Sequence, residues 1–141
     1  MTLPADEELV VQALCKALPD AKLSRMPRHP LRRDILLAII CLDLKRRYAY
    51  SELELNEYLT SALSRLDAEV DHVTCRRYMV DLGFVKRDRA GSRYLLNFPK
   101  LESTLTDAAL ENGHQLLERA IDIQAEKLAS RIARRKARTR G

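Results

Sequence analysis

The residues of this chain best suited to chemistry on a partner molecule are the basic ones that follow Asp71. Arg76 and Arg77 are adjacent, and Lys86, Arg87, Arg89 and Arg93 follow closely. Guanidinium and ammonium groups bind phosphate oxygens, and a guanidinium can also reach the edge of a guanine base. These residue types predict a surface for a polyanion.

The elements that must position these residues are a helix and a hairpin. Asp71 is a plausible N-cap, and Gly83 ends a helix of about three turns. Two β-rich runs follow, Phe84–Asp88 and Arg93–Phe98, and Gly91 between them supplies the positive φ of a tight loop. A helix, a glycine stop and a basic hairpin in this order predict a winged helix-turn-helix.

The helix after Asp71 has a core face and an outward face, at about 100° per residue. Its core face is expected to hold Cys75, Tyr78, Met79 and Leu82. Thr74, Arg77 and Asp81 cluster on the opposite side. Arg77 is therefore expected to point outward, although Asp81 can pair with it at i+4. One available arginine beside an aspartate predicts phosphate contacts more than base recognition.

Arg76 is expected to play a different part, because it lies beside the apolar Val73 and Val80. Its stem should pack inside while its head pairs with a carboxylate of the preceding helix. Glu54 and Glu57 are the candidate partners.

The upstream segments predict further helices. Residues 4–18 form an amphipathic pattern, and a proline-bracketed linker extends to Pro30. Leu31–Lys45 is apolar nearly all round and predicts a central core helix. Residues 46–50 predict a short extended joint, and Ser51 with Glu54 forms the capping box of the next helix.

A long C-terminal helix is expected from Ser103 or Thr106. Its near-heptad apolar stripe comprises Leu110, Leu117, Ile121, Leu128 and Ile132. Such a narrow seam predicts a homodimer through residues 103–132. The alternative is that the helix folds back onto its own domain, against Leu9, Val10 and Leu14. Past Ile132 the basic run is expected to fray into a mobile cationic arm.

Residues 27–94 resemble a bacterial winged-helix family of unknown function, whose members occur alone or attached to regulator domains. The resemblance rests on Tyr50, Glu52, Glu54 and Asn56; on Asp71, His72, Thr74, Arg76, Arg77, Val80, Asp81 and Gly83; and on Gly91, Ser92 and Tyr94. It implies a winged helix and a regulatory role, and it implies no enzyme activity and no known ligand.

The charge is strongly segregated along the chain. The net charge of +5 divides into −3 over residues 1–21, +5 over 22–97, −3 over 98–130 and +6 over 131–141. This segregation favours a polyanionic partner. The expected organisation is an N-terminal helix (1–21), a winged helix-turn-helix domain (22–98), a dimerisation helix (99–132) and a basic tail (133–141).

Several classes of protein are disfavoured by the sequence. The longest apolar run has eight residues, Ile35 to Leu42, against the ~20 that a membrane span needs. Three widely spaced cysteines suit reduced thiols in a cytoplasmic protein. No metal-site spacing, phosphate-binding glycine loop or catalytic triad is apparent, so no enzyme activity, cofactor or metal is expected.

The sequence leads to two hypotheses for the function. The first is a DNA-binding transcriptional regulator that contacts duplex DNA through Arg28, Arg32, Arg33, Thr74, Arg77, Lys86, Arg87, Arg89 and Arg93, with Arg76 as a structural residue. The second is a winged-helix module that binds a partner protein. A continuous positive band over the arginines favours the first hypothesis, and an exposed apolar patch favours the second.

Overall fold

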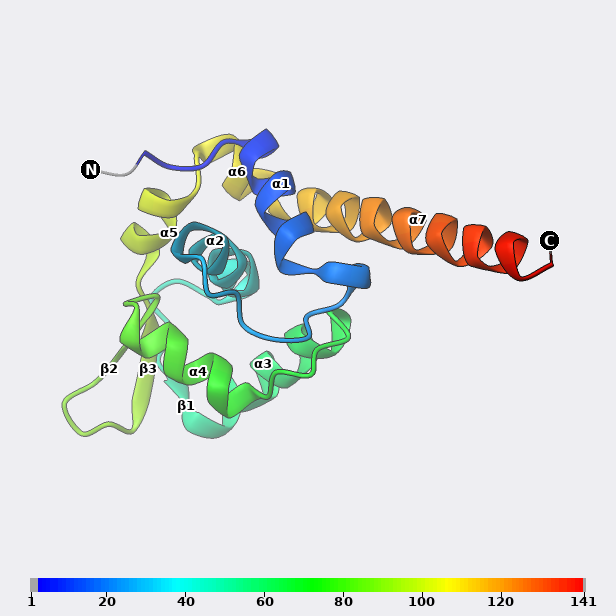
Figure 1. Ribbon diagram of the computed structural model, residues 1–141. Coiled ribbons are helices and arrows are strands. Elements are labelled where there is room, and N and C mark those ends of the chain that lie inside the picture. Colours follow the sequence, from blue (N-terminus) through cyan, green and yellow to red (C-terminus); the bar gives the residue numbers. More distant parts are fainter. Residues whose placement is uncertain (1–2, 141) are drawn as a thin grey trace.

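The computed structural model describes residues 3–140, which are mainly helical with one small antiparallel sheet (Figure 1). The helices are α1 (Glu7–Ala17), α2 (Pro30–Ile40), α3 (Glu52–Arg65), α4 (His72–Asp81), α5 (Phe98–Thr104), α6 (Asp107–Glu111) and α7 (Gly113–Arg140). Single 3-10 turns, η1 (Pro19–Ala21) and η2 (Cys41–Asp43), follow α1 and α2.

Helix α2 is the centre of the core, as its composition predicts. Every residue from Ile35 to Ile40 is buried. α1, α3, α5 and α7 all pack against it, because a helix that is apolar on every side must be covered on every side. The helix ends at Ile40, before the predicted Lys45, because the chain tightens into η2.

Side-chain caps start four of the helices, and three of these caps precede α1, α3 and α4. The Asp6 carboxylate accepts from the Leu9 amide at 2.9 Å. The predicted capping box is present: Ser51 Oγ accepts from the Glu54 amide at 3.1 Å, and Glu54 Oε1 accepts from the Ser51 amide at 2.9 Å. Asp71 caps α4 as predicted, accepting from the Thr74 amide at 2.8 Å. These caps use amide donors that no helical carbonyl can reach.

The predicted hairpin is confirmed, and it belongs to a larger sheet. β2 (Val85–Arg87) and β3 (Arg93–Leu96) pair antiparallel, within the predicted runs but shorter. The predicted joint ends in a third strand, β1 (Tyr50–Ser51), which pairs with β3 and gives the order β1-β3-β2. Two residues show no alternation, so the pattern could not predict β1.

The predicted C-terminal helix is wrong as one continuous element and in its end, although Thr106, one of the two predicted starts, caps α6 and accepts from the Ala109 amide at 3.3 Å. Extended backbone at Leu105 separates α5 from α6, and a parallel bridge joins Leu105 to Ala5. The Thr106 amide donates to the Ala5 carbonyl at 3.0 Å, so the segment before α1 competes for backbone groups that a helix would use. α7 starts at Gly113 and continues past Ile132 to Arg140, through strong helix formers such as Ala133 and Ala137.

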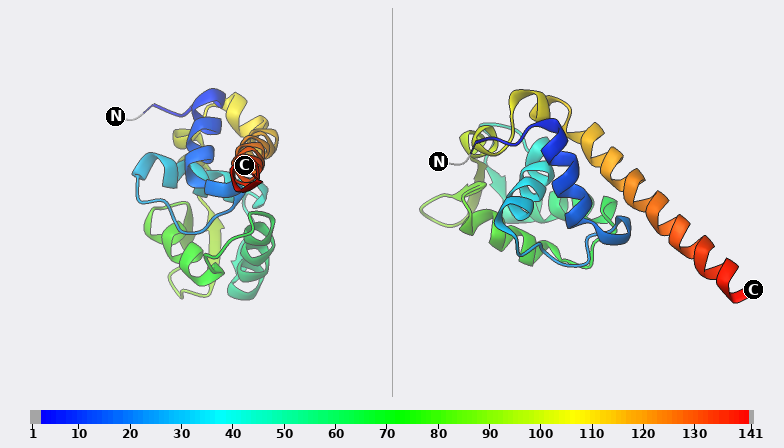
Figure 2. Two further views of the ribbon diagram at one scale, coloured as in Figure 1. Left: turned by 45° about the vertical axis from the view of Figure 1, so that its right-hand side comes forward. Right: turned by 45° about the horizontal axis from the view of Figure 1, so that its top comes forward.

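The first half of α7 folds back onto its own chain, which is the alternative to a dimer raised by the sequence. Leu116 and Ala120 are buried, and α7 packs along α1 and η1. Gln124 Nε2 donates to the carbonyls of Cys15 and Leu18 at 2.9 and 3.2 Å. The basic end of α7 extends beyond the body of the molecule (Figures 1 and 2).

The three cysteines carry free thiols. Cys41 and Cys75 are buried as predicted, and Cys15 is half-buried beside α7. Burial raises the pKa of the Cys75 thiol to about 12. Among residues 3–140, none of the helices combines the length and hydropathy needed to cross a bilayer.

Tyr58 offers a test of how α3 is fastened to the end of α2. Its hydroxyl donates to the Ile40 carbonyl at 2.6 Å and accepts from the Asp43 amide at 3.1 Å. Tyr58→Phe should lower the free energy of unfolding by about 1–2 kcal/mol, because two backbone groups lose their partner. Urea unfolding followed by circular dichroism measures this loss. The half-buried Tyr78→Phe serves as the control, because its hydroxyl forms no hydrogen bond among residues 3–140, and it should change stability by less; equal losses would contradict the assignment.

Candidate nucleic-acid interface

Helix α4 and the β2–β3 hairpin bring Arg77 and Arg87 to one groove. The groove has a volume of about 190 Å³ and lies where α4 meets the sheet and the start of α3. Its lining residues are Glu52, Val73, Arg76, Arg77, Val80, Asp81, Arg87 and Tyr94. Two of the predicted contact residues, Arg77 and Arg87, which are ten positions apart in the sequence, therefore border one surface.

Arg77 is exposed on the outward face of α4, as predicted, and so are Thr74 and Asp81. Between residues 3 and 140, no carboxylate forms an ion pair with Arg77. The i+4 pair with Asp81 is therefore not formed, although Asp81 borders the same groove. The Arg77 guanidinium is available to a ligand in this conformation.

Arg76 is a structural residue whose partner differs from both candidates. Its side chain is 18% exposed and its Nη2 lies 3.2 Å from Glu52 Oε1. Nη1 donates to Asn56 Oδ1. Glu52 and Asn56 lie one turn apart on the same face of α3, so one guanidinium can hold both. The contact ties α4 to α3.

Glu54 is unavailable to Arg76 because it has other partners. It completes the capping box at Ser51 and accepts from the Tyr48 hydroxyl. The Tyr48 hydroxyl, followed by the Ser51 amide, lowers the pKa of Glu54. Arg93 Nη1 lies 3.8 Å from the same carboxylate. Arg93 therefore has part of its charge balanced within the chain.

The loop of the hairpin is held by Asp88. Its Oδ1 accepts from the amides of Ser92 and Arg93 at 2.8 and 3.2 Å, and its Oδ2 accepts from Ser92 Oγ at 3.2 Å. Gly91 has a φ of 71°, as the loop prediction requires. Desolvation favours the neutral acid, but the hydrogen bonds outweigh it and lower the pKa of Asp88.

The hairpin presents its basic residues on an ordered loop. Arg87 Nη2 donates to the Gly91 carbonyl at 3.1 Å, and the guanidinium lies 5.4 Å from the centre of the Tyr94 ring. Lys86 and Arg89 are exposed. Because the loop is ordered before any ligand arrives, binding loses less conformational entropy.

The predicted basic flank before α2 lies apart from this groove. Arg28 and Arg32 border a different depression, of about 490 Å³, together with Lys16 and Arg25. Arg33 Nε lies 3.3 Å from Asp34 Oδ1. The structure therefore does not bring the flank into the α4–hairpin groove. Neither Lys16 nor Arg25 was predicted. Only the fold places Lys16 beside Arg28, whereas Arg25 is three residues from Arg28 in the sequence and could have been included.

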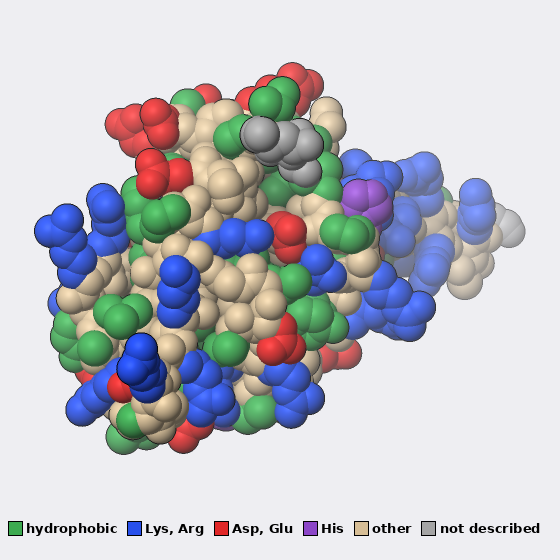
Figure 3. All heavy atoms as spheres, turned by 90° about the vertical axis from the view of Figure 1, so that its left-hand side faces the viewer, with side chains coloured by type: hydrophobic (Ala, Val, Ile, Leu, Met, Phe, Trp, Pro, Cys, Tyr) green, Lys and Arg blue, Asp and Glu red, His purple; other side chains and the backbone are tan. Residues whose placement is uncertain are grey.

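The face that carries the hairpin is basic but not uniformly so (Figure 3). Lys and Arg side chains are spread over its middle and lower parts, with hydrophobic and isolated acidic side chains between them. Acidic side chains gather at the top of this view. Val73 on α4 is 41% exposed and Leu53 on α3 is 68% exposed. The face in this view thus shows neither a continuous positive band nor one large apolar patch.

Residues 22–96 match the model of a family described as an uncharacterized protein conserved in bacteria (DUF2087). The chain belongs to this family. The DUF2087 region runs from the linker before α2 to the end of β3 and includes α4 and the whole sheet. Neither the curated proteins nor the solved structures contain a significant match. The family has no assigned biochemistry, so function must be argued from the site.

The two adjacent arginines of the DUF2087 region should separate stability from binding. Arg76→Ala should lower the free energy of unfolding by about 1–2 kcal/mol, because Glu52 and Asn56 lose a charged partner. Arg77→Ala should change it by less than about 0.5 kcal/mol, because this side chain is exposed and unpaired within residues 3–140. Urea unfolding of both variants measures the difference. Equal midpoints would show that the faces of α4 are wrongly assigned.

The Asp88 carboxylate should titrate below its ordinary pKa of 3.8. Since the folded-state pKa is lowered, its contribution to loop order is present above about 3.8 and is lost as the pH falls through the folded-state value. The Ser92 amide shift, followed by NMR from pH 6 to about 2, reports this step. Asp88→Asn is the control and should remove it. A midpoint at or above 3.8 would contradict the hydrogen-bonded loop.

Proposed function

We propose that this DUF2087 protein is a winged helix-turn-helix that binds duplex DNA and acts in transcriptional regulation. In this proposal α3, the turn at 66–71 and α4 form the helix-turn-helix, and the β2–β3 hairpin is the wing. The observation that carries it is the shared groove, which Arg77 enters from the outward face of α4 and Arg87 enters from the wing.

The proposed contacts are mainly to phosphate. Lys86, Arg87 and Arg89 would contact the backbone from the wing, while Thr74 and Arg77 approach a groove of the duplex from α4. Arg93 is expected to contribute less, because Glu54 lies 3.8 Å from it. One unpaired arginine on the outward face of α4 supports limited sequence choice. The proposal includes no catalytic residue, cofactor or metal, and bacterial DNA as ligand implies a cytoplasmic protein.

The flank and the dimer are separate parts of the proposal. Arg28 and Arg32 would add phosphate contacts only where the DNA extends past α4, whereas Arg33 is paired with Asp34. The homodimer through α7 remains a prediction. Leu117, Ile121 and Leu128 are half-buried and Ile132 is 43% exposed, while Leu110 belongs to α6. A two-fold dimer would have to form along this apolar stripe, which the rest of the chain already covers in part.

The alternative function is a protein-interaction module with the same fold. It is favoured by the exposed Val73, which borders the same groove as Arg77, and by Asp81 beside it. A partner with a small apolar side chain next to a basic group would fit these two features. Binding to such a partner would be nearly independent of salt, whereas phosphate binding is not.

DNA affinity should therefore fall steeply with salt. If roughly 4–6 phosphates are neutralised, the slope of log K against log salt concentration should be about −4 to −5. Fluorescence anisotropy with a random duplex between low and physiological salt measures it. Absence of binding even at low salt would remove the proposal.

Arg77→Ala should weaken DNA binding by roughly tenfold, because a charged contact at the centre of the interface is lost. Arg65→Ala is the matched control: it also removes one positive charge, from an exposed side chain at the far end of α3. Its affinity should stay within about twofold of the parent protein. Equal losses in the two variants would show that only net charge matters and would contradict a specific interface.

A further inference from the structure

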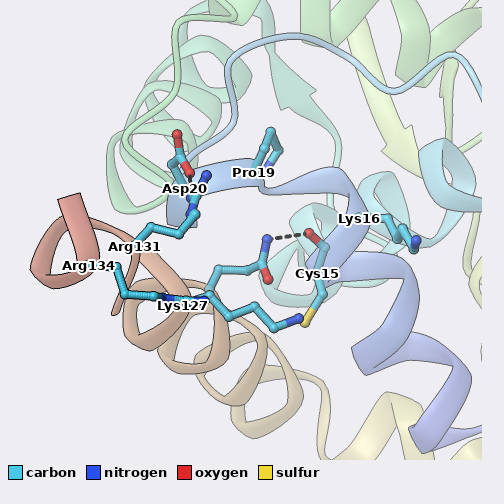
Figure 4. Close-up of a pocket in the computed structure, with 8 residues that line it drawn as sticks. Cys15, Lys16, Pro19, Asp20, Lys127, Arg131 and Arg134 are labelled. Carbon is cyan, nitrogen blue, oxygen red and sulfur yellow. Dashed lines mark hydrogen bonds and ion pairs between the residues drawn. The ribbon is translucent and has the colours of Figure 1, made fainter. Parts of the chain in front are cut away.

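A larger basic cleft lies between α1, η1 and α7, on the side of the molecule away from the wing (Figures 1 and 4). Its volume of about 640 Å³ is within the range of small-molecule sites. Its lining residues are Cys15, Lys16, Pro19, Asp20, Gln124, Lys127, Arg131 and Arg134. None of the DNA contacts proposed above uses this cleft.

The cations that line the cleft outnumber its carboxylates, so the cleft has a net positive charge. Asp20 supplies the one carboxylate of the lining, and it pairs with Arg131. Within residues 3–140, Lys127 and Arg134 form no ion pair. Arg134 Nε has only a long contact of 3.4 Å to the Ser130 carbonyl. Their donors are therefore available to an anion.

The charges of α7 are sorted by face. Lys127, Arg131 and Arg134 follow one another at i, i+4 and i+7, so they share the face that borders the cleft. The acidic residues of α7 lie on a face roughly 150° away, at about 100° per residue. They are Glu118, Asp122 and Glu126. An anion in the cleft therefore faces the cations of α7 and not the carboxylates of that helix.

The walls of the cleft are tied together. Gln124 joins α7 to the carbonyls of Cys15 and Leu18, at the end of α1. Asp20 and Ala21 have φ angles of 57° and 63°, in the left-handed region that residues other than glycine rarely adopt. This turn directs the Asp20 carboxylate to Arg131. Backbone of this kind is concentrated at ligand sites, where surrounding contacts hold it.

We propose that the cleft binds a small phosphate-bearing anion of nucleotide size. Guanidinium groups match phosphate oxygens with paired hydrogen bonds, and a polyphosphate can engage several cations where a single carboxylate engages one. The volume exceeds what a lone phosphate ion fills, and Pro19 and Cys15 supply a less polar wall for the rest of the ligand. The proposal does not rest on DNA binding by α4 and the wing.

The test is isothermal titration of the full chain, at constant ionic strength, with pyrophosphate and with ATP as probes. Both should bind, and adenosine without phosphate should not. The double variant Lys127→Gln, Arg134→Gln should lose roughly tenfold or more in affinity, because charged hydrogen bonds are removed. The matched control Arg138→Gln, Arg140→Gln removes the same charge from the exposed end of α7. It should stay within about twofold of the parent protein.

Two results would overturn the proposal. The first is that neither pyrophosphate nor ATP binds; if a short duplex then binds and loses affinity in the Lys127→Gln, Arg134→Gln variant, the cleft is assigned to nucleic-acid backbone. The second is an equal loss in the two double variants, which would indicate general attraction by a basic helix. Arg77→Ala should leave ATP affinity unchanged, so a failure of this site is distinguishable from a failure of the DNA proposal.

Discussion

The burial of α2 is the constraint on which the rest of the structure depends. Six consecutive residues, Ile35 to Ile40, are withdrawn from water, and each large side chain among them contributes about 1.5–3 kcal/mol when fully buried. No single neighbour can cover a helix that is apolar on every side. α1, α3, α5 and α7 must therefore surround it, which brings the N-terminal and C-terminal segments into one core.

The packing around α2 also determines which charged side chains are exposed. α3 packs on α2 and buries Leu55 and Leu59, while its Glu52 and Asn56 hold Arg76 of α4. With Arg76 fixed inward, the next residue along the helix must face outward. Arg77 therefore owes its exposure to the burial of its neighbour, because adjacent helical residues are about 100° apart.

The long helix α7 combines two different environments. Near its start it is part of the core, where Gly113 lies against Leu42 and Ile39 and a Cβ would meet their side chains. Further along, it packs on α1 and η1, and its last turns project into solvent (Figure 2). The cationic face of α7 is therefore held against the body at one end only. That geometry leaves a cleft beside η1 that contains both fixed and solvent-exposed cations.

The sequence by itself determined the elements whose signals are local. The capping box at Ser51, the cap at Asp71, the positive φ at Gly91 and the core face of α4 all follow from residues within a few places of one another. The partial burial of Arg76 was also predictable, because its helical neighbours are apolar. Such features are decided by backbone geometry and helical periodicity, which a single segment contains.

Only the tertiary structure decided the features that join distant segments. β1 exists because β3 offers it an edge, and the C-terminal region breaks at Leu105 because Ala5 takes its backbone hydrogen bonds. Glu52 replaced the expected Glu54 because Tyr48 and Ser51 already engage that carboxylate. The cleft at α7 likewise needs Asp20 and Arg131 side by side, although 111 positions separate them. Residue types predict which groups seek partners, but competition among all available partners in space decides which pairs form.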